Sequence, residues 1–163
     1  MLYKAYYTSP LGTITLLSNA DYLLGLWFND QKHYAANYDL TTATSLINVP
    51  IKKTEDWLTQ YFAGEVLSPA ILPLKPEVTV FRNKVLNILK NVPYGETITY
   101  GEIASKLEKP GSARAVGGAV GHNPIAIVIP CHRVLGSNHT LTGYAGGIDR
   151  KVALLSLEKL HKN

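Results

Sequence analysis

The chain has 163 residues, of which 46% are hydrophobic and 17% are charged, and its formal net charge is +4. This composition excludes a disordered chain, because it supplies enough apolar surface for one substantial core or two small ones. Every apolar run is far shorter than the roughly 20 residues of a membrane span, and the first residues lack the charged-then-apolar layout of a signal peptide. We therefore expect a globular cytoplasmic protein without a membrane partner.

The charge is distributed unevenly along the chain. Residues 1–75 carry five Lys or Arg and six Asp or Glu, a balance of −1, whereas residues 76–163 carry eleven and six, a balance of +5. A basic half favours a polyanionic partner such as DNA, although a solvated basic surface without a partner is a common alternative. The single cysteine, Cys131, excludes an internal disulfide, and no His/Cys cluster has zinc spacing, so we expect a free thiol and no metal.

The first half of the chain predicts a small antiparallel sheet with one helix. Short runs rich in Tyr, Leu, Ile and Thr, separated by turn residues, indicate three strands at residues 2–7, 11–17 and 22–28. Residues 31–50 show no clear period and support a helix only weakly. Apolar residues at helical spacing predict a helix from Thr54 that ends at Gly64. The expected role of this half is structural.

Three prolines in residues 69–76 mark a linker. They divide the chain into an N-terminal α/β structural domain, residues 1–75, and a C-terminal domain, residues 76–163, which carries the basic charge and Cys131. Thr79 can cap the first C-terminal helix, whose apolar positions are Phe81, Val85, Ile88 and Leu89. The fold class expected is α+β, with a small N-terminal antiparallel sheet and helix followed by a mostly helical, winged-helix-like domain.

Two further short helices have the outline of a helix-turn-helix. Thr99 and Glu102 form a capping box for the first, Pro110 and Gly111 end it, and Ser112 can cap the second. The second is rich in small residues, although each interior glycine costs about 1 kcal/mol relative to alanine. Those small residues are Ala113, Ala115, Gly117, Gly118, Ala119 and Gly121. Close packing against another helix would explain them, and so would close approach to nucleic acid in a minor groove about 6 Å wide.

The apolar run Ile125–Ile129 predicts a buried extended segment that leads to Cys131. Pro130 and His132 flank the cysteine. A lone cysteine is commonly a small buried hydrophobe, but a neighbouring imidazole, a neighbouring guanidinium and a proline favour an activated thiol, because the thiolate is the nucleophile. His132 can serve Cys131 only if the chain turns here, since adjacent side chains on a straight strand point to opposite faces.

The last helix has Ile148, Val152 and Leu155 at spacings of four and three residues, which predicts its buried face. Glu158 lies on the shoulder of that face. Cys131, His132 and Glu158 supply a nucleophile, a base and an acid that orients the base. From spacing alone, a surface or helix-capping role for Glu158 is the stronger reading.

The segment 123–134, Asn-Pro-Ile-Ala-Ile-Val-Ile-Pro-Cys-His-Arg-Val, closely resembles the active-site signature of the O6-alkylguanine-DNA alkyltransferases, also called methylated-DNA–protein-cysteine methyltransferases. The resemblance covers roughly residues 78–160; its other blocks are 92–97, Tyr100, 113–119, 143–147 and Glu158. It implies a monomeric DNA-repair protein that moves an alkyl group from O6-alkylguanine in double-stranded DNA to its own cysteine. It also implies that residues 76–163 are a DNA-binding and alkyl-transfer domain. It also implies a single turnover without a cofactor, and leaves O4-alkylthymine open as a second substrate.

The resemblance also implies roles for individual residues. Cys131 accepts the alkyl group, His132, a water and Glu158 complete its network, and Asn123 ties the helix-turn-helix to the active-site turn. The small-residue helix enters the minor groove and Arg114 fills the space left by a flipped base; the residues expected at DNA are Ser112, Ala113, Arg114, Ala115, Gly117 and Gly118. Tyr100 presses on the phosphate or reaches the base.

The same resemblance implies a base pocket formed by Tyr100, Val134, Tyr144, Ala145 and Gly146. The carbonyls of Cys131 and Val134 would accept from the guanine amine, Tyr144 would stack on the base, and Arg133 would support the fold through an ion pair. Ala145 stands where some family members have serine, which removes a side-chain donor and leaves adduct preference open.

Two other functions remain compatible with the residues. A cysteine hydrolase would use the same Cys, His and Glu types but would turn over. A non-catalytic helix-turn-helix protein would bind lesions or operators without transferring a group, although relatives of that kind replace the cysteine. Thiol-based redox sensing is a further side activity open to Cys131.

Overall fold

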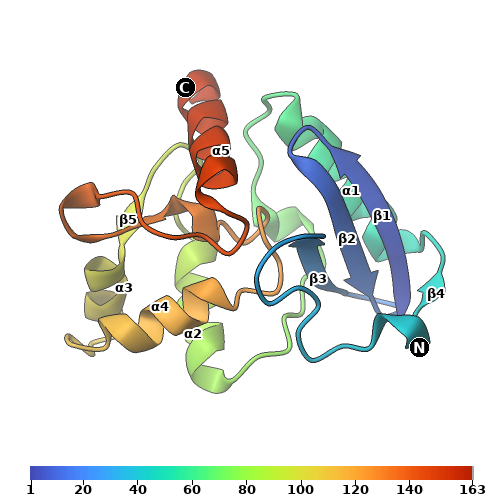
Figure 1. Cartoon of the computed structure of the whole chain (residues 1–163), viewed down its shortest axis with the longest axis horizontal. Helices are drawn as coiled ribbons and strands as arrows, with labels where there is room; N and C mark the ends of the chain where they lie inside the picture. Colours follow the sequence, from blue (N-terminus) through green and yellow to red (C-terminus); the bar gives the residue numbers. More distant parts are fainter. Residues whose placement is uncertain (163) are drawn as a thin grey trace.

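The computed structural model of the chain describes residues 1–162. Strands β1 (Tyr3–Ser9), β2 (Gly12–Ser18) and β3 (Leu23–Phe28) form the predicted antiparallel meander. A short strand, β4 (Thr44–Ser45), pairs in parallel with β1, so the sheet order is β3-β2-β1-β4. Helix α1 (Val49–Phe62) packs on one face of this sheet (Figure 1).

Helix α1 begins five residues before the predicted start at Thr54. Asn48 is its N-cap, with the Oδ1 atom accepting from the Ile51 N–H at 3.3 Å, and Pro50 occupies the first turn, where its missing N–H costs nothing. Gly64 follows the helix with a φ of +96°, the left-handed conformation that suits a glycine at this position. The weakly supported helix before Asn48 is absent; a 3-10 turn (Leu40–Thr42) and β4 occupy that stretch.

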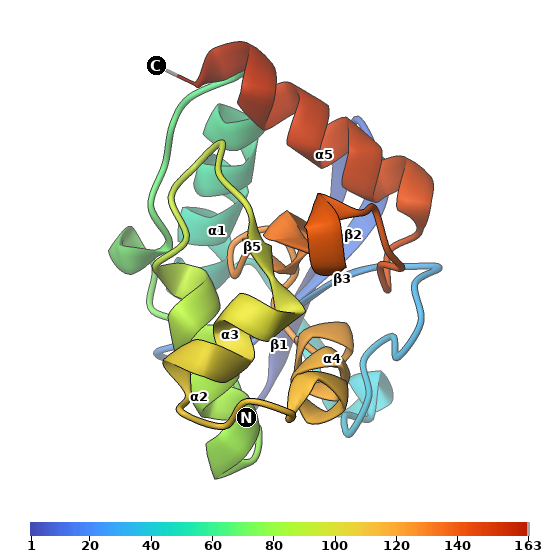
Figure 2. The same cartoon turned by 90° about the vertical axis from the view of Figure 1, so that its left-hand side faces the viewer.

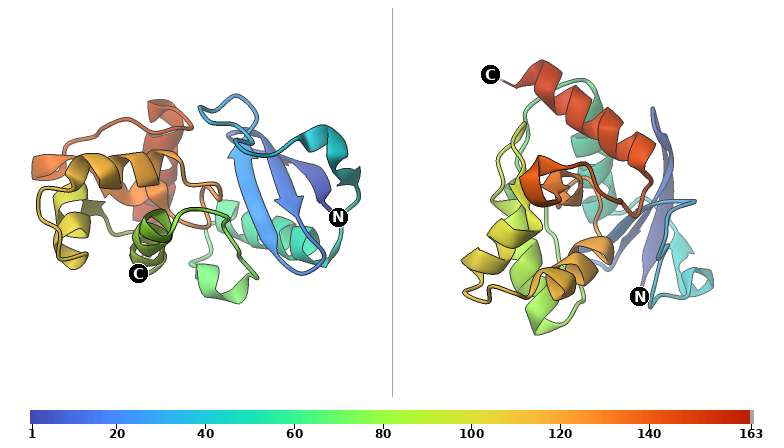
Figure 3. Two further views of the ribbon diagram at one scale, coloured as in Figure 1. Left: turned by 90° about the horizontal axis from the view of Figure 1, so that it is seen from below. Right: turned by 60° about the vertical axis from the view of Figure 1, so that its left-hand side comes forward.

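The C-terminal half contains α2 (Val80–Lys90), α3 (Tyr100–Lys106), α4 (Ala113–Gly121) and α5 (Ile148–His161). Strands β5 (Ile98–Thr99) and β6 (Val134–Leu135) form a short parallel pair. Helices α3 and α4 pack against each other as a helix-turn-helix, with α5 crossing above them (Figure 2). Seen from below, the sheet with α1 lies on one side and α2 to α5 on the other (Figure 3).

Two of the three helix caps predicted for this half are confirmed. The Thr79 Oγ1 accepts from the Arg82 N–H at 3.2 Å, and Thr99 and Glu102 form the complete capping box. Ser112 precedes α4 but makes no cap hydrogen bond, so that prediction is wrong. Its ψ of 17° departs from the extended backbone of an N-cap, and its Oγ is buried without a partner among the described residues.

The segment before the cysteine is buried as predicted, but it is not extended. Ile125 bridges to β3, where the Leu26 N–H donates to the Pro124 carbonyl at 2.8 Å and the Ala126 N–H donates to the Leu26 carbonyl at 3.0 Å. The chain then turns at Ile127, which has a φ of +67°, and the Ile129 N–H donates back to the Ile125 carbonyl at 3.1 Å. One hydrophobic core runs from the sheet through this segment to α5. The domain boundary at residue 75 therefore stays a prediction.

Helix α5 buries a different face from the one predicted. Ile148 is 40% exposed and Val152 is 43% exposed, whereas the buried positions are Lys151, Leu154 and Glu158. Glu158 therefore points into the core, not along its edge. Within residues 1–162, no helix is both long and apolar enough to cross a bilayer.

Candidate active site

Cys131 begins a 3-10 turn that ends at Arg133, so the chain bends where the cysteine and the histidine meet. Pro130 precedes the turn with a ψ of 67°, and the Cys131 N–H donates to the Ile129 carbonyl at 2.8 Å. Asn123 holds the approach: its Nδ2 donates to the carbonyls of Ile125 at 3.2 Å and Ile129 at 2.9 Å. The amide therefore links the end of α4 to the reactive turn.

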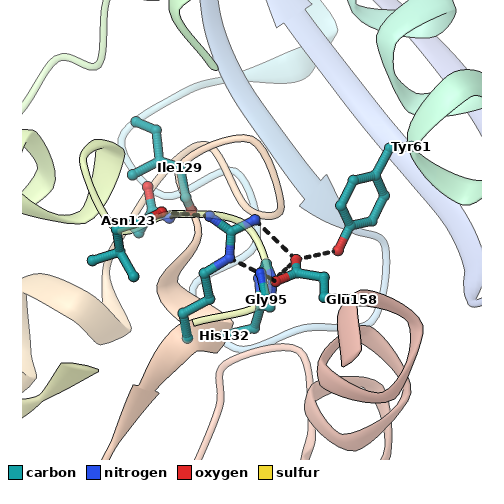
Figure 4. A network of polar contacts seen from close by, with 8 residues as sticks. Tyr61, Gly95, Asn123, Ile129, His132 and Glu158 are labelled. Carbon is teal, nitrogen blue, oxygen red and sulfur yellow. Dashed lines mark hydrogen bonds and ion pairs between the residues drawn. The ribbon is translucent and has the colours of Figure 1, made fainter. Parts of the chain in front are cut away.

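Glu158 is the centre of a buried polar cluster (Figure 4), which we call the Glu158 network. Its Oε2 accepts from His132 Nε2 at 2.6 Å, from the Tyr61 hydroxyl at 2.6 Å and from Arg133 Nη2 at 3.0 Å. Its Oε1 accepts from Arg133 Nε at 2.7 Å and from the Gly95 N–H at 3.2 Å. Arg133 thus makes the bidentate ion pair expected of it, with the carboxylate that also orients His132.

The protonation states in this network follow from burial and charge. Burial alone would raise the pKa of Glu158, but the hydrogen bond from His132 and the hydrogen bonds and charge of Arg133 outweigh it and hold that pKa well below its usual range. Burial lowers the pKa of His132 and outweighs the effect of Glu158, so the imidazole is neutral and donates its Nε2–H. The Nδ1 atom is buried without a partner among the described residues, which leaves it as the ring's proton acceptor.

Cys131 is buried in its resting state and needs a base. Burial raises the pKa of its thiol, although Asn123, Tyr144 and the charge of Lys151 each act in the opposite direction. A thiol with a raised pKa is a weak nucleophile, since the thiolate is the reactive form. A neutral imidazole with one free nitrogen in the next residue is suited to remove the proton through a bridging water.

A cavity of about 270 Å³ opens against the cysteine, a little below the roughly 300 Å³ at which small-molecule pockets usually begin. Its walls are formed by Lys32, His33, Tyr100, Gly117, Val120, Gly121, Cys131, Gly143, Tyr144 and Ala145. Of the five predicted pocket residues, Tyr100, Tyr144 and Ala145 meet here. Gly146 lies behind the Tyr144 ring, where an added Cβ would come within 2.7 Å of it.

Val134 does not line this cavity, and its carbonyl already has a donor. The Nζ of Lys151 donates to the Val134 carbonyl at 2.6 Å and reaches the carbonyls of Thr142 and Gly143 at 3.4 Å. Lys151 is a buried cation that ties the active-site turn to the pocket loop, and sequence reasoning missed it because lysine on a helix is usually an outward residue.

Helix α4 has small residues on its outer face, although Ala119 is buried. Ala113, Arg114 and Ala115 are exposed, and a second cavity of about 560 Å³ lies beside Arg114. Tyr100 and Gly117 line both this cavity and the one at the cysteine. A Cβ added at Gly118 or at Gly121 would meet nothing within 4 Å, so internal packing does not explain those glycines.

The N-terminal half also reaches the site, contrary to the purely structural role expected for it. Lys32 and His33 line the cysteine cavity, and the Lys32 N–H donates to the Ala145 carbonyl at 3.0 Å. His33 stacks on His122, with ring centroids 3.8 Å apart. Tyr61 comes from α1. Sequence reasoning missed these residues because nothing in residues 31–50 or in the helical pattern of α1 marks contacts this distant along the chain.

The chain is similar to known proteins over nearly its whole length. The family model for the ribonuclease-like domain of 6-O-methylguanine DNA methyltransferase matches residues 2–76, and the model for its DNA binding domain matches residues 80–160. A Haemophilus influenzae protein named methylated-DNA–protein-cysteine methyltransferase is 43% identical over 160 residues, covering 98% of this chain and 87% of that protein. A Methanosarcina acetivorans protein of the same name is 43% identical, covering 96% of this chain and 98% of that protein.

A solved structure described as Mycobacterium tuberculosis OGT in complex with DNA is similar in sequence and in fold. It superposes with a TM-score of 0.88 at 43% identity, covering 98% of this chain and 94% of the other. The α+β fold is therefore shared over nearly the whole length of both chains. With matches of this extent in both halves, the chain belongs to the 6-O-methylguanine DNA methyltransferase family.

Proposed function

We propose that this protein repairs alkylated DNA by transferring the alkyl group from the O6 atom of guanine to Cys131. The observation that supports this most strongly is the single thiol of the chain, placed at a cavity of about 270 Å³ and backed by the Glu158 network. Membership of a family whose members are named methylated-DNA–protein-cysteine methyltransferases supports the same reaction.

The reaction begins with loss of the thiol proton. The proton passes from Cys131 through a water to the Nδ1 of His132, while Glu158 keeps its hydrogen bond to the Nε2–H and stabilises the resulting imidazolium. The thiolate attacks the alkyl carbon, an S–C bond forms and the C–O6 bond breaks. The electron pair stays on the guanine, which takes up a proton from Tyr100 or from solvent and leaves as unmodified guanine.

The product explains why each molecule acts once. The alkylated Cys131 is a thioether, which has no acidic proton and no leaving group that water displaces at a useful rate. Neither the attack nor the departure of guanine requires an electron carrier, so the proposed reaction uses no cofactor. The protein is consumed in stoichiometric amounts, and we propose that it acts as a monomer because one chain supplies every residue of the site.

Duplex DNA must deliver the base to a cavity that lies inside the protein. A base within the stack cannot reach a buried thiol, so the nucleotide must rotate out of the helix. Arg114 lies beside the cavity that shares Tyr100 and Gly117 with the cysteine pocket, which suits it to occupy the gap left in the stack. The open outer face at Gly118 and Gly121 suits close approach of α4 to the minor groove.

A mass measurement tests the proposed function. The protein is mixed with duplex DNA containing one O6-methylguanine, and the intact mass and peptide masses are recorded. We expect one added methyl group, located on Cys131, and none in a Cys131→Ser variant. Methyl groups on another residue, or conversion of more than one equivalent of O6-methylguanine to guanine per protein, would refute it, and the second result would indicate a hydrolase.

A further inference from the structure

We propose that Tyr61, in the N-terminal helix α1, is a positioning residue for the alkyl transfer, because its hydroxyl fixes the carboxylate that orients His132. This inference rests on the proposed function and extends the site to the half of the chain expected to be structural. Tyr61 lies 97 residues from Glu158 in sequence, yet its hydroxyl donates to the Glu158 Oε2 at 2.6 Å.

The two oxygens of Glu158 are held by different sets of donors. Oε1 is fixed by the Arg133 Nε and the Gly95 N–H. Oε2 accepts from His132, and the donors that hold it there are the Tyr61 hydroxyl at 2.6 Å and the Arg133 Nη2 at 3.0 Å. The hydrogen bond from the Tyr61 hydroxyl is the shorter of those two. Its removal would leave the oxygen that faces His132 less well fixed.

The Tyr61 hydroxyl donates to Glu158 in its protonated form. Burial raises the pKa of its phenol, and the negative charge of Glu158 raises it further against the opposing charge of Arg133. The hydroxyl therefore stays protonated, and its single proton points at the carboxylate. A hydrogen bond to a charged group is about twice as strong as one between neutral groups.

The ring of Tyr61 is positioned without help from the hydroxyl. It stacks on Trp57 with centroids 5.3 Å apart and packs edge-on against Tyr94 at 6.2 Å. A Tyr61→Phe variant therefore removes the donor and keeps the packing. Tyr94 offers a matched control, because its own hydroxyl is buried and has no partner among the described residues.

The first readout is the single-turnover rate of methyl transfer from duplex DNA and from free O6-methylguanine. We expect Tyr61→Phe to slow both by about 10- to 150-fold, the effect of losing one charge-assisted hydrogen bond. DNA affinity should be unchanged, and Tyr94→Phe should stay within about twofold of the wild type. Thermal unfolding of both variants shows whether folding is preserved.

The second readout does not require any transfer. Nitrogen NMR of labelled histidine follows the ring of His132, assigned with a His132→Asn variant. Loss of the Tyr61 donor changes the hydrogen bond between the Glu158 Oε2 and the His132 Nε2–H, so Tyr61→Phe should shift the His132 nitrogen signals, while Tyr94→Phe should not. If Tyr61 served only to pack, neither Tyr61→Phe nor Tyr94→Phe would shift the His132 nitrogen signals. If Tyr61→Phe does not fold, fluorotyrosine at position 61 keeps the ring, strengthens the donor and should shift the His132 signals in the opposite direction.

The outcomes separate this inference from the proposed function. A wild-type protein that takes up no methyl group would refute the function. If the wild-type protein takes up the methyl group, but Tyr61→Phe and Tyr94→Phe have the same transfer rate and the same His132 signals, the role of Tyr61 is overturned and the function stands. Unchanged His132 signals with fluorotyrosine would overturn it as well.

Discussion

Replacing Glu158 with glutamine breaks the buried network at its centre. Glu158 is 1% exposed and Arg133 is 4% exposed, so the substitution leaves the guanidinium charge buried without its counter-ion. It also places an amide NH₂ among groups that are themselves donors. Removing one partner of a buried ion pair costs about 3–5 kcal/mol, which is a large part of the roughly 5–15 kcal/mol that stabilises a typical domain.

The same substitution should slow alkyl transfer, because the glutamine amide no longer selects the tautomer with a proton on Nε2. General-base assistance is worth about 10²- to 10⁴-fold, and we expect the loss to fall in that range. Urea unfolding gives the stability, and a quenched single-turnover assay below the unfolding transition gives the rate. Glu65→Gln, at an exposed position, is the control for the change of charge. A Glu158→Gln protein within about 1 kcal/mol and twofold of the wild type would refute the reasoning.

Three further outcomes are expected. Arg114→Ala should slow repair of duplex DNA by about 10- to 1000-fold while leaving the reaction with free O6-methylguanine unchanged, and equal losses on both substrates would contradict a role in base flipping. DNA affinity should fall linearly on a log-log plot against salt, because residues 76–163 carry a balance of +5; an affinity indifferent to salt would exclude phosphate contacts. The pKa of Glu158 is lowered by folding, so its stabilising contribution is present above the unfolded value of 4.5 and is lost as the pH falls. The difference in unfolding free energy between the wild type and Glu158→Gln should therefore narrow in acid, and a constant difference would contradict the ion pairing.

Local chemistry was predictable from the sequence where a few neighbouring residues decide the outcome. Thr79 caps α2 and the Thr99–Glu102 box caps α3, because each cap joins residues only three positions apart. Gly64 follows α1 for an equally local reason, since its backbone has a positive φ. The three strands were also predicted, because β1, β2 and β3 follow one another as a meander.

The predictions that were wrong concern features that depend on contacts between residues far apart in the sequence. The run before Cys131 has the composition of a strand, but its bridge to β3 and its ties to Asn123 force a turn at Ile127. Helix α5 was assigned the wrong face because Lys151 interrupts the apolar pattern. The buried ammonium group of Lys151 donates to the carbonyls of residues 134, 142 and 143. These residues lie outside the helix, so the spacing of apolar residues within α5 could not predict that Lys151 is buried.

The contacts across the two halves argue that the reactive site belongs to the whole chain. In a C-terminal fragment without α1, the Glu158 Oε2 would lose the Tyr61 donor, and the carboxylate would be more open to solvent on the side where Tyr61 now lies. Solvent would weaken the pairing that lowers its pKa and orients His132, since charge interactions are stronger in a low-dielectric interior. The Ala145 carbonyl would also lose the N–H of Lys32, which holds the pocket loop from the N-terminal side. The sheet and α1 therefore do more than support the fold: they close the environment on which the proposed proton path from Cys131 depends.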